Sequence, residues 1–233
     1  MQYRRAKTPG GTYFFTVNLL ERQQDLLVQH IAVLRTVVQK IMADHPFHID
    51  AMVVLPDHLH AVWALPKNDA DFSTRWGLIK AGFSRYLPAN EQRNASRASK
   101  GERGIWQRRF WEHLIRDEKD HTAHLDYCHY NPVKHGYVES AAQWPYSSFH
   151  RCVQHGIYKM DWGINNENDI VGVRSSPQPT KLAEDQEDLA AFEERAGEPL
   201  MTYQELLNDL KTHGQSRKGG PGNIASIDNS LKS

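Results

Sequence analysis

Two apolar, β-branched stretches separated by only two residues constrain the fold of this chain more than any other feature. Residues 48–55 read HIDAMVVL and residues 58–65 read HLHAVWAL, with Pro56-Asp57 between them. Runs of this composition favour strands. A break this short, built from turn-forming residues, joins neighbouring antiparallel strands. The pattern therefore predicts a β-hairpin over residues 48–65.

Further helix-like and strand-like segments flank this hairpin. Before it, residues 12–19 form an aromatic, β-branched run, and residues 26–43 place apolar side chains at helical spacing. After it, residues 72–87 predict a second helix, residues 105–115 a fourth strand and residues 117–130 a third helix. The first six elements follow the split βαβ order. We therefore predict an α+β fold: a ferredoxin-like or RRM-like sandwich whose four-stranded antiparallel sheet carries helices on one face.

Charge divides the chain into two parts. Residues 1–162 carry 21 Lys and Arg against 16 Asp and Glu, whereas residues 163–233 carry 7 against 12. We predict a mildly basic folded domain over 1–162 and an acidic, partly helical or disordered C-terminal extension over 163–233. Residues 88–104 are polar and basic, and we expect them to form a mobile loop. A basic domain is compatible with a polyanionic partner.

Composition excludes several classes of protein. No apolar run approaches the roughly 18–20 residues that span a bilayer, and no apolar segment follows the N-terminal charges as in a secretory signal. The two cysteines, Cys128 and Cys152, cannot form a disulfide framework or a four-cysteine zinc site. We expect a cytoplasmic protein with no membrane partner.

The second strand of the hairpin carries a candidate metal site. Because alternate side chains of a strand share a face, His58 and His60 project together while Leu59 faces away. Two imidazoles on one face can chelate a divalent cation. In a chain with 13 histidines, such a pair also arises by chance or as a hydrogen-bonded pair. These residues alone leave both interpretations open.

A second pair of polar residues lies at the end of the predicted third helix. Tyr127 and Asn131 are four residues apart, so they share one helix face. The amide oxygen of Asn131 can complete a two-histidine site, and this set of nitrogen and oxygen ligands suits Mg²⁺ or Mn²⁺. The Tyr127 phenol becomes a nucleophile only when a base or a bound cation assists it. Taken alone, packing by Tyr127 and helix termination at Asn131 are the simpler interpretations.

Nearly all of residues 3–162 resemble a known family, the REP-associated tyrosine transposases. These are relatives of the single-tyrosine HUH transposases of small bacterial insertion sequences. The resemblance rests on GGTYFFTVNL at 10–19, VVLPDHLHAVWALP at 53–66, DFSTRWGLIK at 71–80, IWQRRFWEHLIRDEKD at 105–120, HLDYCHYNPVKHGYV at 124–138 and WPYSSFHR at 144–151. It does not extend into the acidic C-terminal part.

The resemblance implies a metal-dependent single-stranded DNA endonuclease and strand transferase that acts on palindromic REP-type hairpins. Tyr127 would be the nucleophile and form a 5′-phosphotyrosine. His58, His60 and Asn131 would bind Mg²⁺ or Mn²⁺, and His124, which shares the helix face of Tyr127, is a candidate for an assisting role. We expect a monomer, with a homodimer as the alternative, that associates with the nucleoid when it acts.

Interleaved basic and aromatic side chains favour single-stranded DNA, because exposed bases stack on rings while a basic groove follows the backbone. For the aromatic residues the competing interpretation is core packing, and for the arginines it is solubility. The candidates for DNA contact are Arg4, Arg5, Lys7, Trp106, Arg108, Arg109 and Lys134.

Two other functions compete with this one. A non-catalytic RRM-like module would bind nucleic acid through aromatic motifs on its central strands, where this chain has His58-Leu59-His60. A metal-dependent hydrolase would use water as its nucleophile and leave Tyr127 structural. Formation of a covalent DNA adduct separates both alternatives from the transposase.

Overall fold

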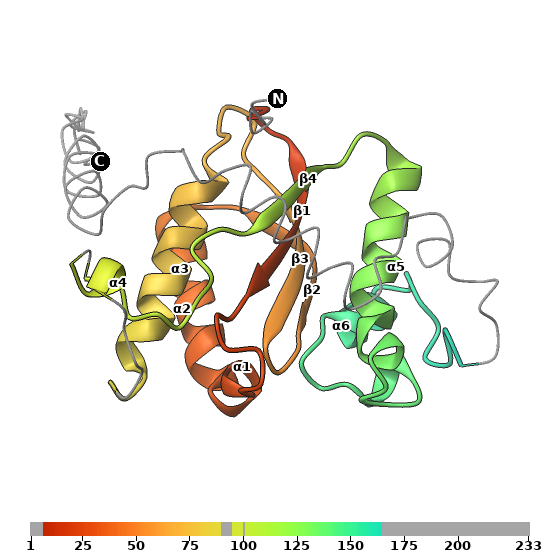
Figure 1. The fold of residues 1–233 in the computed structure, drawn as a ribbon. Helices are drawn as coiled ribbons and strands as arrows, with labels where there is room; N and C mark the ends of the chain where they lie inside the picture. Colours follow the sequence, from red (N-terminus) through yellow and green to blue (C-terminus); the bar gives the residue numbers. More distant parts are fainter. Residues whose placement is uncertain (1–6, 90–94, 100, 165–233) are drawn as a thin grey trace, which may run out of the picture.

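A single four-stranded sheet forms the centre of the computed structural model, which describes residues 7–89, 95–99 and 101–164. The strands are β1 (Thr12–Asn18), β2 (His48–Val54), β3 (His58–Ala64) and β4 (Trp111–Leu114). Each pairing is antiparallel and the order is β2-β3-β1-β4 (Figure 1). This is the order of a split βαβ sandwich, so the predicted α+β fold is confirmed. The acidic extension predicted after residue 162 lies outside the described residues beyond residue 164.

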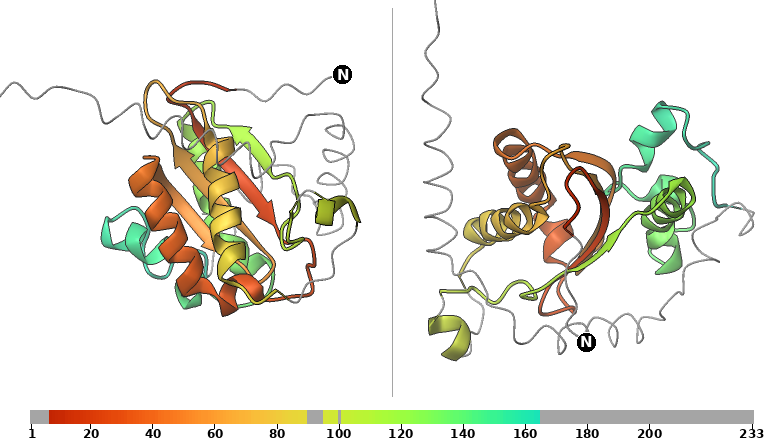
Figure 2. Two further views of the ribbon diagram at one scale, coloured as in Figure 1. Left: turned by 90° about the vertical axis from the view of Figure 1, so that its left-hand side faces the viewer. Right: turned by 90° about the horizontal axis from the view of Figure 1, so that it is seen from above.

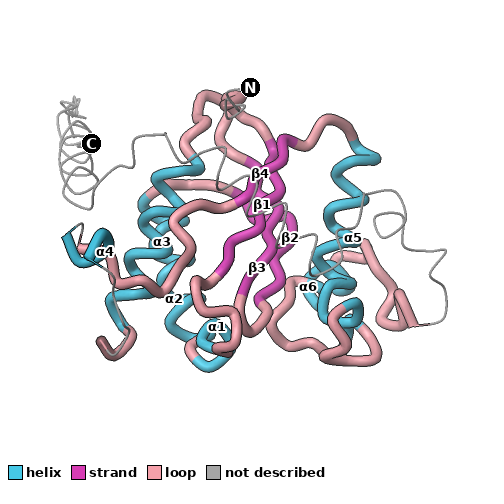
Figure 3. Tube along the Cα trace, in the orientation of Figure 1, coloured by secondary structure: helices cyan, strands magenta, loops and turns pink. Residues whose placement is uncertain are grey.

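Helices cover both faces of this sheet. The predicted layer consists of α2 (Ile31–Asp44) and α3 (Phe72–Tyr86), whereas α5 (Glu118–Lys134) lies on the opposite face (Figures 1 and 2). None of the helices in the described part of the chain is long and apolar enough to cross a membrane. The short elements are α1 (Leu26–Gln29), α4 (Ala95–Ser99), a 3-10 turn (Ala141–Gln143) and α6 (Phe149–Gln154), and Figure 3 labels the three short α-helices.

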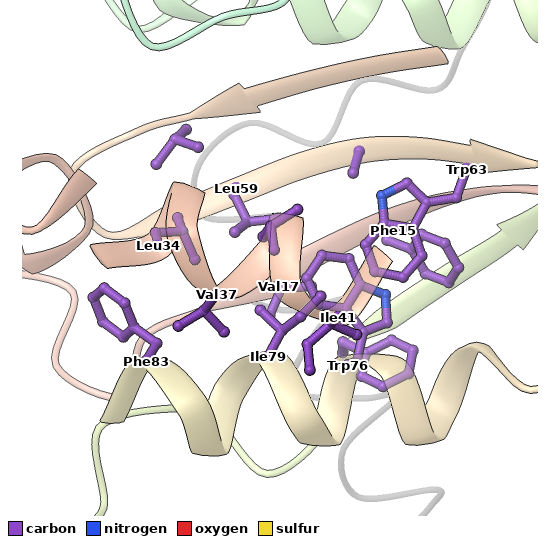
Figure 4. Close-up of a cluster of buried hydrophobic side chains, with 14 of the residues drawn as sticks. Phe15, Val17, Leu34, Val37, Ile41, Leu59, Trp63, Trp76, Ile79 and Phe83 are labelled. Atoms are coloured by element: carbon purple, nitrogen blue, oxygen red, sulfur yellow. The ribbon is translucent and has the colours of Figure 1, made fainter. Parts of the chain in front are cut away.

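Large aromatic side chains fill the layer between the sheet and helices α2 and α3. Trp63 of β3 stacks on Trp76 of α3 with 4.1 Å between ring centroids and 15° between ring planes. Phe15 of β1 packs against both rings, and Leu59 of β3 lies in the same cluster (Figure 4). Burying a side chain of this kind contributes roughly 1.5–3 kcal/mol. This face of β3 is therefore committed to the core, which leaves the alternate residues of β3 to the α5 side.

Two predicted elements differ in extent from those observed. The helix predicted over residues 26–43 is divided into α1 and α2, because His30 leaves helical backbone geometry with φ −110° and ψ 31°. The strand predicted over residues 105–115 is only four residues long. Ahead of β4, an isolated bridge joins Trp106 to Leu19, and the Gln107 amide donates to the Asn18 carbonyl at 3.1 Å. Residues 105–110 thus follow β1 without forming a regular strand.

Helix α5 continues through Pro132, although the sequence predicted that Asn131-Pro132 ends it. A proline inside a helix loses one backbone hydrogen bond. Here the missing hydrogen bond lies near the end of the helix, and the residues that follow still form theirs. The His135 amide donates to the Asn131 carbonyl and the Tyr137 amide donates to the Pro132 carbonyl, both at 3.0 Å. Asn131 is therefore a helical residue and stays on the face of Tyr127.

The basic loop predicted over residues 88–104 contains helix α4, and arginines anchor its described part. Arg97 Nη1 donates to the Trp106 carbonyl at 3.3 Å. The Arg103 guanidinium donates to the Leu87 and Pro88 carbonyls at 2.8 Å and 2.6 Å. These contacts join the described part of the loop to the end of α3 and to the segment before β4, and its mobility stays a prediction. Residues 90–94 and 100 lie outside the described residues.

Arg75 ties the start of α3 to the turn between α2 and β2, and this generates a prediction. Its guanidinium is buried, donates to the His45 and Pro46 carbonyls and pairs with Asp69 at 2.6 Å. Hydrogen bonds that involve a charged group contribute roughly 1.5–3 kcal/mol each. We expect Arg75→Met to lower the free energy of urea unfolding by about 2 kcal/mol, and exposed Arg85→Ala on the same helix to change it by under about 0.5 kcal/mol. Equal losses would contradict this role.

His121 and Asp50 join α5 to β2 through a contact that depends on pH. His121 Nε2 lies 3.0 Å from Asp50 Oδ2, and His48 Nδ1 lies 2.7 Å from Asp50 Oδ1. The hydrogen bond to Asp50, opposed by burial, raises the pKa of His121 above 6.5. Although burial opposes it, hydrogen bonds from His121 and His48 lower the pKa of Asp50 below 3.8.

Because the pKa of His121 is raised in the folded state, its contact with Asp50 contributes its full stability below the pKa that His121 has in the unfolded chain. This contribution is lost as pH rises through the pKa of the folded state. The contribution of Asp50 is present above its unfolded-state pKa and is lost as pH falls through its lowered value. We therefore expect the loss of unfolding free energy in His121→Gln to be larger at about pH 5.5 than at about pH 8.5. Chemical unfolding at both pH values measures it, and a pH-independent difference would refute the coupling.

Candidate metal and tyrosine site

His58 and His60 lie on the sheet face that α5 covers. Their neighbours Leu59 and Ala61 belong to the core against α2 and α3, so alternation along β3 directs both imidazoles to the α5 side. The two ring centroids are 5.0 Å apart and the ring planes make an angle of 82°. Each residue is only 2% exposed. The shared orientation that the sequence predicts is present in the structure.

Both imidazoles are held through their Nδ1 atoms. His58 Nδ1 lies 2.7 Å from Asp57 Oδ1, and His60 Nδ1 lies 2.9 Å from the Thr16 hydroxyl of β1. Asp57 also accepts a hydrogen bond from Arg22 Nε at 2.8 Å. Although burial opposes it, the hydrogen bond with His58 and the Arg22 guanidinium hold the pKa of Asp57 well below its usual range. The ionised carboxylate accepts a hydrogen bond from His58 Nδ1, so Nε2 is the ring nitrogen that remains to face a ligand.

The remaining polar atoms of the two histidines fit a cation. Both Nε2 atoms are buried without a hydrogen-bond partner among the described residues, and the same holds for the side-chain amide of fully buried Asn131. An unsatisfied buried polar group costs roughly 1–3 kcal/mol. Burial, together with repulsion by nearby basic groups, lowers the pKa of His60, so its ring is neutral and able to bind a metal. Two imidazole nitrogens and an amide oxygen can bind a divalent cation, and the choice of Mg²⁺ or Mn²⁺ stays a prediction.

Tyr127 of α5 places its ring against this pair. The ring centroid lies 5.1 Å from that of His60, and the planes make an angle of 75°. Phe14 lies 5.7 Å away in an edge-on contact, and Lys134 Nζ lies 5.0 Å from the centre of the Tyr127 ring. Tyr127 is half-buried, unlike the two histidines. The structure thus brings the predicted tyrosine and the predicted histidines together, with part of the tyrosine open to solvent.

Basic groups surround the histidine pair. Arg22, Lys134 and His135 are close enough to His60 for their charges to lower its pKa. The His135 ring lies 5.5 Å from the His58 ring. A concentration of positive charge in a partly buried site attracts anions such as a phosphate group.

His124 shares the helix face of Tyr127 but contacts β4. Its Nδ1 donates to the Asp120 carbonyl at 2.8 Å, and its ring stacks on that of His113 with 4.7 Å between centroids. Phe14 contacts both His124, at 4.7 Å, and Tyr127, at 5.7 Å. Burial lowers the pKa of His124, which favours a neutral ring. These contacts link His124 to Tyr127 through Phe14, and an assisting role for His124 stays a prediction.

Trp106 is buried, which contradicts the role in base stacking predicted for it. It is 7% exposed, its ring packs edge-on against Phe83, and its Nε1 donates to the Lys80 carbonyl at 3.2 Å. This arrangement leaves little of the ring for a nucleotide base. Trp106 instead packs between α3 and the segment before β4. Its indole ring makes the apolar contact there, and its N–H group donates the hydrogen bond.

The other residues predicted to bind DNA have different surroundings. Arg4 and Arg5 lie outside the described residues, and Lys7 is exposed. Arg108 Nε lies 2.9 Å from Glu102 Oε2 in an ion pair, and Arg109 is half-buried. DNA contact by these residues, and by Lys134 beside Tyr127, stays a prediction.

Sequence reasoning missed three residues that hold the histidines. It assigns Asp57 to a turn and does not single out Thr16 or Arg22. Asp57 could have been identified from the sequence, because it directly precedes His58 and a carboxylate often binds the second ring nitrogen of a metal-binding histidine. Thr16 reaches His60 through the β1–β3 register, and Arg22 arrives from the segment after β1, so neither contact is visible in the local sequence.

Comparisons with known proteins give a consistent result, although no family model matches the chain. A REP-associated tyrosine transposase of Haemophilus influenzae is 49% identical over 171 residues, which cover 73% of this chain and 97% of the relative. Another, of Escherichia coli, is 47% identical over 161 residues, covering 69% and 90%. A solved structure of a REP-associated tyrosine transposase bound to a REP hairpin is 44% identical, with a TM-score of 0.61, and the match covers 72% of this chain and 96% of that one. The chain therefore belongs to the REP-associated tyrosine transposases.

Proposed function

We propose that this protein is a metal-dependent single-stranded DNA endonuclease and strand transferase. It acts on palindromic REP-type hairpins through a covalent 5′-phosphotyrosine. The observation that carries the proposal is the Tyr127 ring 5.1 Å from the ring of His60, beside two imidazoles whose Nε2 atoms lack a hydrogen-bond partner within the described chain. Membership of the family, and a related structure described as bound to a REP hairpin, support the choice of DNA substrate.

Tyr127 acts as the nucleophile in this proposal. Its oxygen attacks phosphorus, a tyrosine O–P bond forms and the P–O3′ bond breaks. The phenol gives up its proton and the departing 3′-oxygen takes one up, so the overall reaction exchanges one phosphodiester for another. The energy of the bond is retained, and a 3′-hydroxyl can later attack the phosphotyrosine without ATP. A divalent cation held by His58, His60 and Asn131 supplies charge stabilisation at the phosphate oxygens when bound.

The surrounding residues orient the reacting groups. Asp57 and Thr16 fix the two imidazoles through their Nδ1 atoms. Lys134 adds positive charge beside Tyr127, and Arg22 holds the Asp57 carboxylate that orients His58. Because each site offers one tyrosine, one DNA end is held covalently at a time, and we expect the protein to act as a monomer, with a homodimer as the alternative.

Binding of nucleic acid on an open sheet, as in an RRM, does not suit this structure. The face that such a module would use is covered by α5, and Tyr127 and Cys128 pack there against Phe14 and Val62.

In the proposed function, basic side chains contact the DNA backbone. They are Lys7, Arg108, Arg109 and the N-terminal arginines, Arg4 and Arg5.

Replacing the tyrosine tests the covalent step. We expect Tyr127→Phe to abolish the adduct and lower hairpin cleavage by about 10³-fold or more, as loss of a covalent nucleophile does. The assay incubates end-labelled hairpin DNA with the protein and Mn²⁺, denatures the sample and separates adduct from free DNA. Tyr130→Phe, on the same helix, is the matched control and should leave the adduct intact. Cleavage that survives Tyr127→Phe would instead favour a hydrolase that uses water.

Asp57 tests the orientation of the metal-binding histidines. We expect Asp57→Asn to weaken Mn²⁺ binding by about 10–100-fold, because the neutral amide no longer holds the Nδ1 proton of His58 as strongly. Hairpin affinity without metal should stay unchanged. Isothermal titration with Mn²⁺ and a fluorescence binding assay measure the two quantities, and exposed Asp44→Asn serves as the control. Equal loss of DNA affinity and metal affinity would mean that Asp57 acts only in folding.

A further inference from the structure

A second group of potential metal ligands lies apart from the His58–His60 pair. His113 of β4 and Asp120 and His124 of α5 each offer a ligand atom, and the three atoms lie within 4.8 Å of one another. His113 Nε2 is 2.9 Å from Asp120 Oδ2, and His124 Nδ1 is 3.1 Å from Asp120 Oδ1. The group includes His124, the predicted assisting residue, but shares no ligand with the His58–His60 pair, which it meets through the ring of Phe14.

The local sequence explains why these three residues meet. Only residues 115–117 connect β4 to α5, so the end of the strand lies beside the start of the helix. Asp117 caps α5 by accepting a hydrogen bond from the Asp120 amide at 2.8 Å. This cap places Asp120 in the first turn, and His124 follows it four residues later on the same face. The rings of His124 and His113 then stack nearly parallel, with 18° between planes.

The surroundings of the three side chains suit a cation. Their exposed fractions are 25% for His113, 9% for Asp120 and 12% for His124, so the group is partly buried and still reachable from solvent. Although burial opposes it, hydrogen bonds from His113 and Arg116 lower the pKa of Asp120 to about 2, which leaves it ionised. Two imidazoles and one carboxylate form a recurrent ligand set for zinc and other divalent first-row transition metals.

For an ion to bind, the 2.9 Å hydrogen bond between His113 Nε2 and Asp120 Oδ2 must break, and two further contacts must yield. Arg116 Nε lies 3.2 Å from Asp120 Oδ2, but the Arg116 side chain is 74% exposed and can turn into water. His124 Nδ1 donates to the Asp120 carbonyl, so binding at this atom requires the other tautomer, with the ring proton on Nε2. Neither contact is a buried pair of charges, which keeps the cost of the exchange low.

We propose that His113, Asp120 and His124 form a second cation site, which takes a zinc-type divalent transition metal and fastens the first turns of α5 to β4. The site goes beyond the proposed DNA-processing function and does not depend on it. His124 precedes Tyr127 by three residues, so an ion here also restrains the helical turn that leads to the tyrosine.

Metal titration tests the site directly. The untagged full-length chain is stripped with a chelator and titrated with Zn²⁺ by isothermal calorimetry. We expect His113→Ala and Asp120→Asn each to lose one of the zinc equivalents that the wild type binds, because the affinity at this site falls by more than about 100-fold. A loss of this size exceeds the effect of removing a residue that only orients a ligand. His155→Ala removes an exposed histidine elsewhere and should bind as the wild type does. Equal stoichiometry and affinity in all four chains would overturn the proposal.

Hydrogen exchange supplies a second readout, and it also guards against loss of the fold. Zn²⁺ should slow exchange of the amides of residues 118–124 in the wild type and leave them unchanged in His113→Ala. If His113→Ala does not fold, His113→Gln decides the matter, because its amide can still bond Asp120 but is a poor zinc ligand. Unaltered exchange in the wild type with Zn²⁺ would also refute the site. Hairpin cleavage is assayed separately, so failure of the metal site and failure of the Tyr127 mechanism give different results.

Discussion

The antiparallel pairing of β1 with β3 is the contact on which the candidate site depends. This register sets Thr16 opposite His60 and Asn18 opposite His58. A shift by one residue would turn both imidazoles into the apolar layer and Leu59 toward α5. The aromatic stack of Trp63 on Trp76 makes such a shift costly, since it would move Trp63 to the other face of the sheet, away from Trp76. The apolar core on one face thereby determines the geometry of the polar site on the other.

Strand β3 thus serves two purposes at once. Its odd-numbered positions hold α2 and α3 through apolar contact, while His58 and His60 present buried, unsatisfied nitrogens to α5. Buried polar atoms without partners oppose folding by roughly 1–3 kcal/mol each. Apolar burial on the opposite face offsets this cost, and a bound cation would remove it. Helix α5 completes the arrangement, because it carries both a predicted third ligand, Asn131, and the tyrosine.

The sequence was sufficient to predict the fold and the position of the histidine pair, because both follow from local periodicity. The hairpin turn at Pro56-Asp57 and the alternation at His58-Leu59-His60 are properties of neighbouring residues. Burial of Trp106 could not be predicted in this way, since it depends on the contact between α3 and a segment more than twenty residues later. The same holds for the Arg22–Asp57 pair, which forms only when the chain after β1 meets the hairpin turn.

The most direct test of the account is the position of a bound cation relative to Tyr127. Crystals of the full chain grown with Mn²⁺ can be measured at the manganese absorption edge, where anomalous scattering locates the ion without bias from the protein atoms. The account predicts an anomalous peak bonded to the Nε2 atoms of His58 and His60 and to Asn131 Oδ1, next to the Tyr127 phenol. The absence of a peak between the two imidazoles, under conditions in which the protein cleaves DNA, would contradict it.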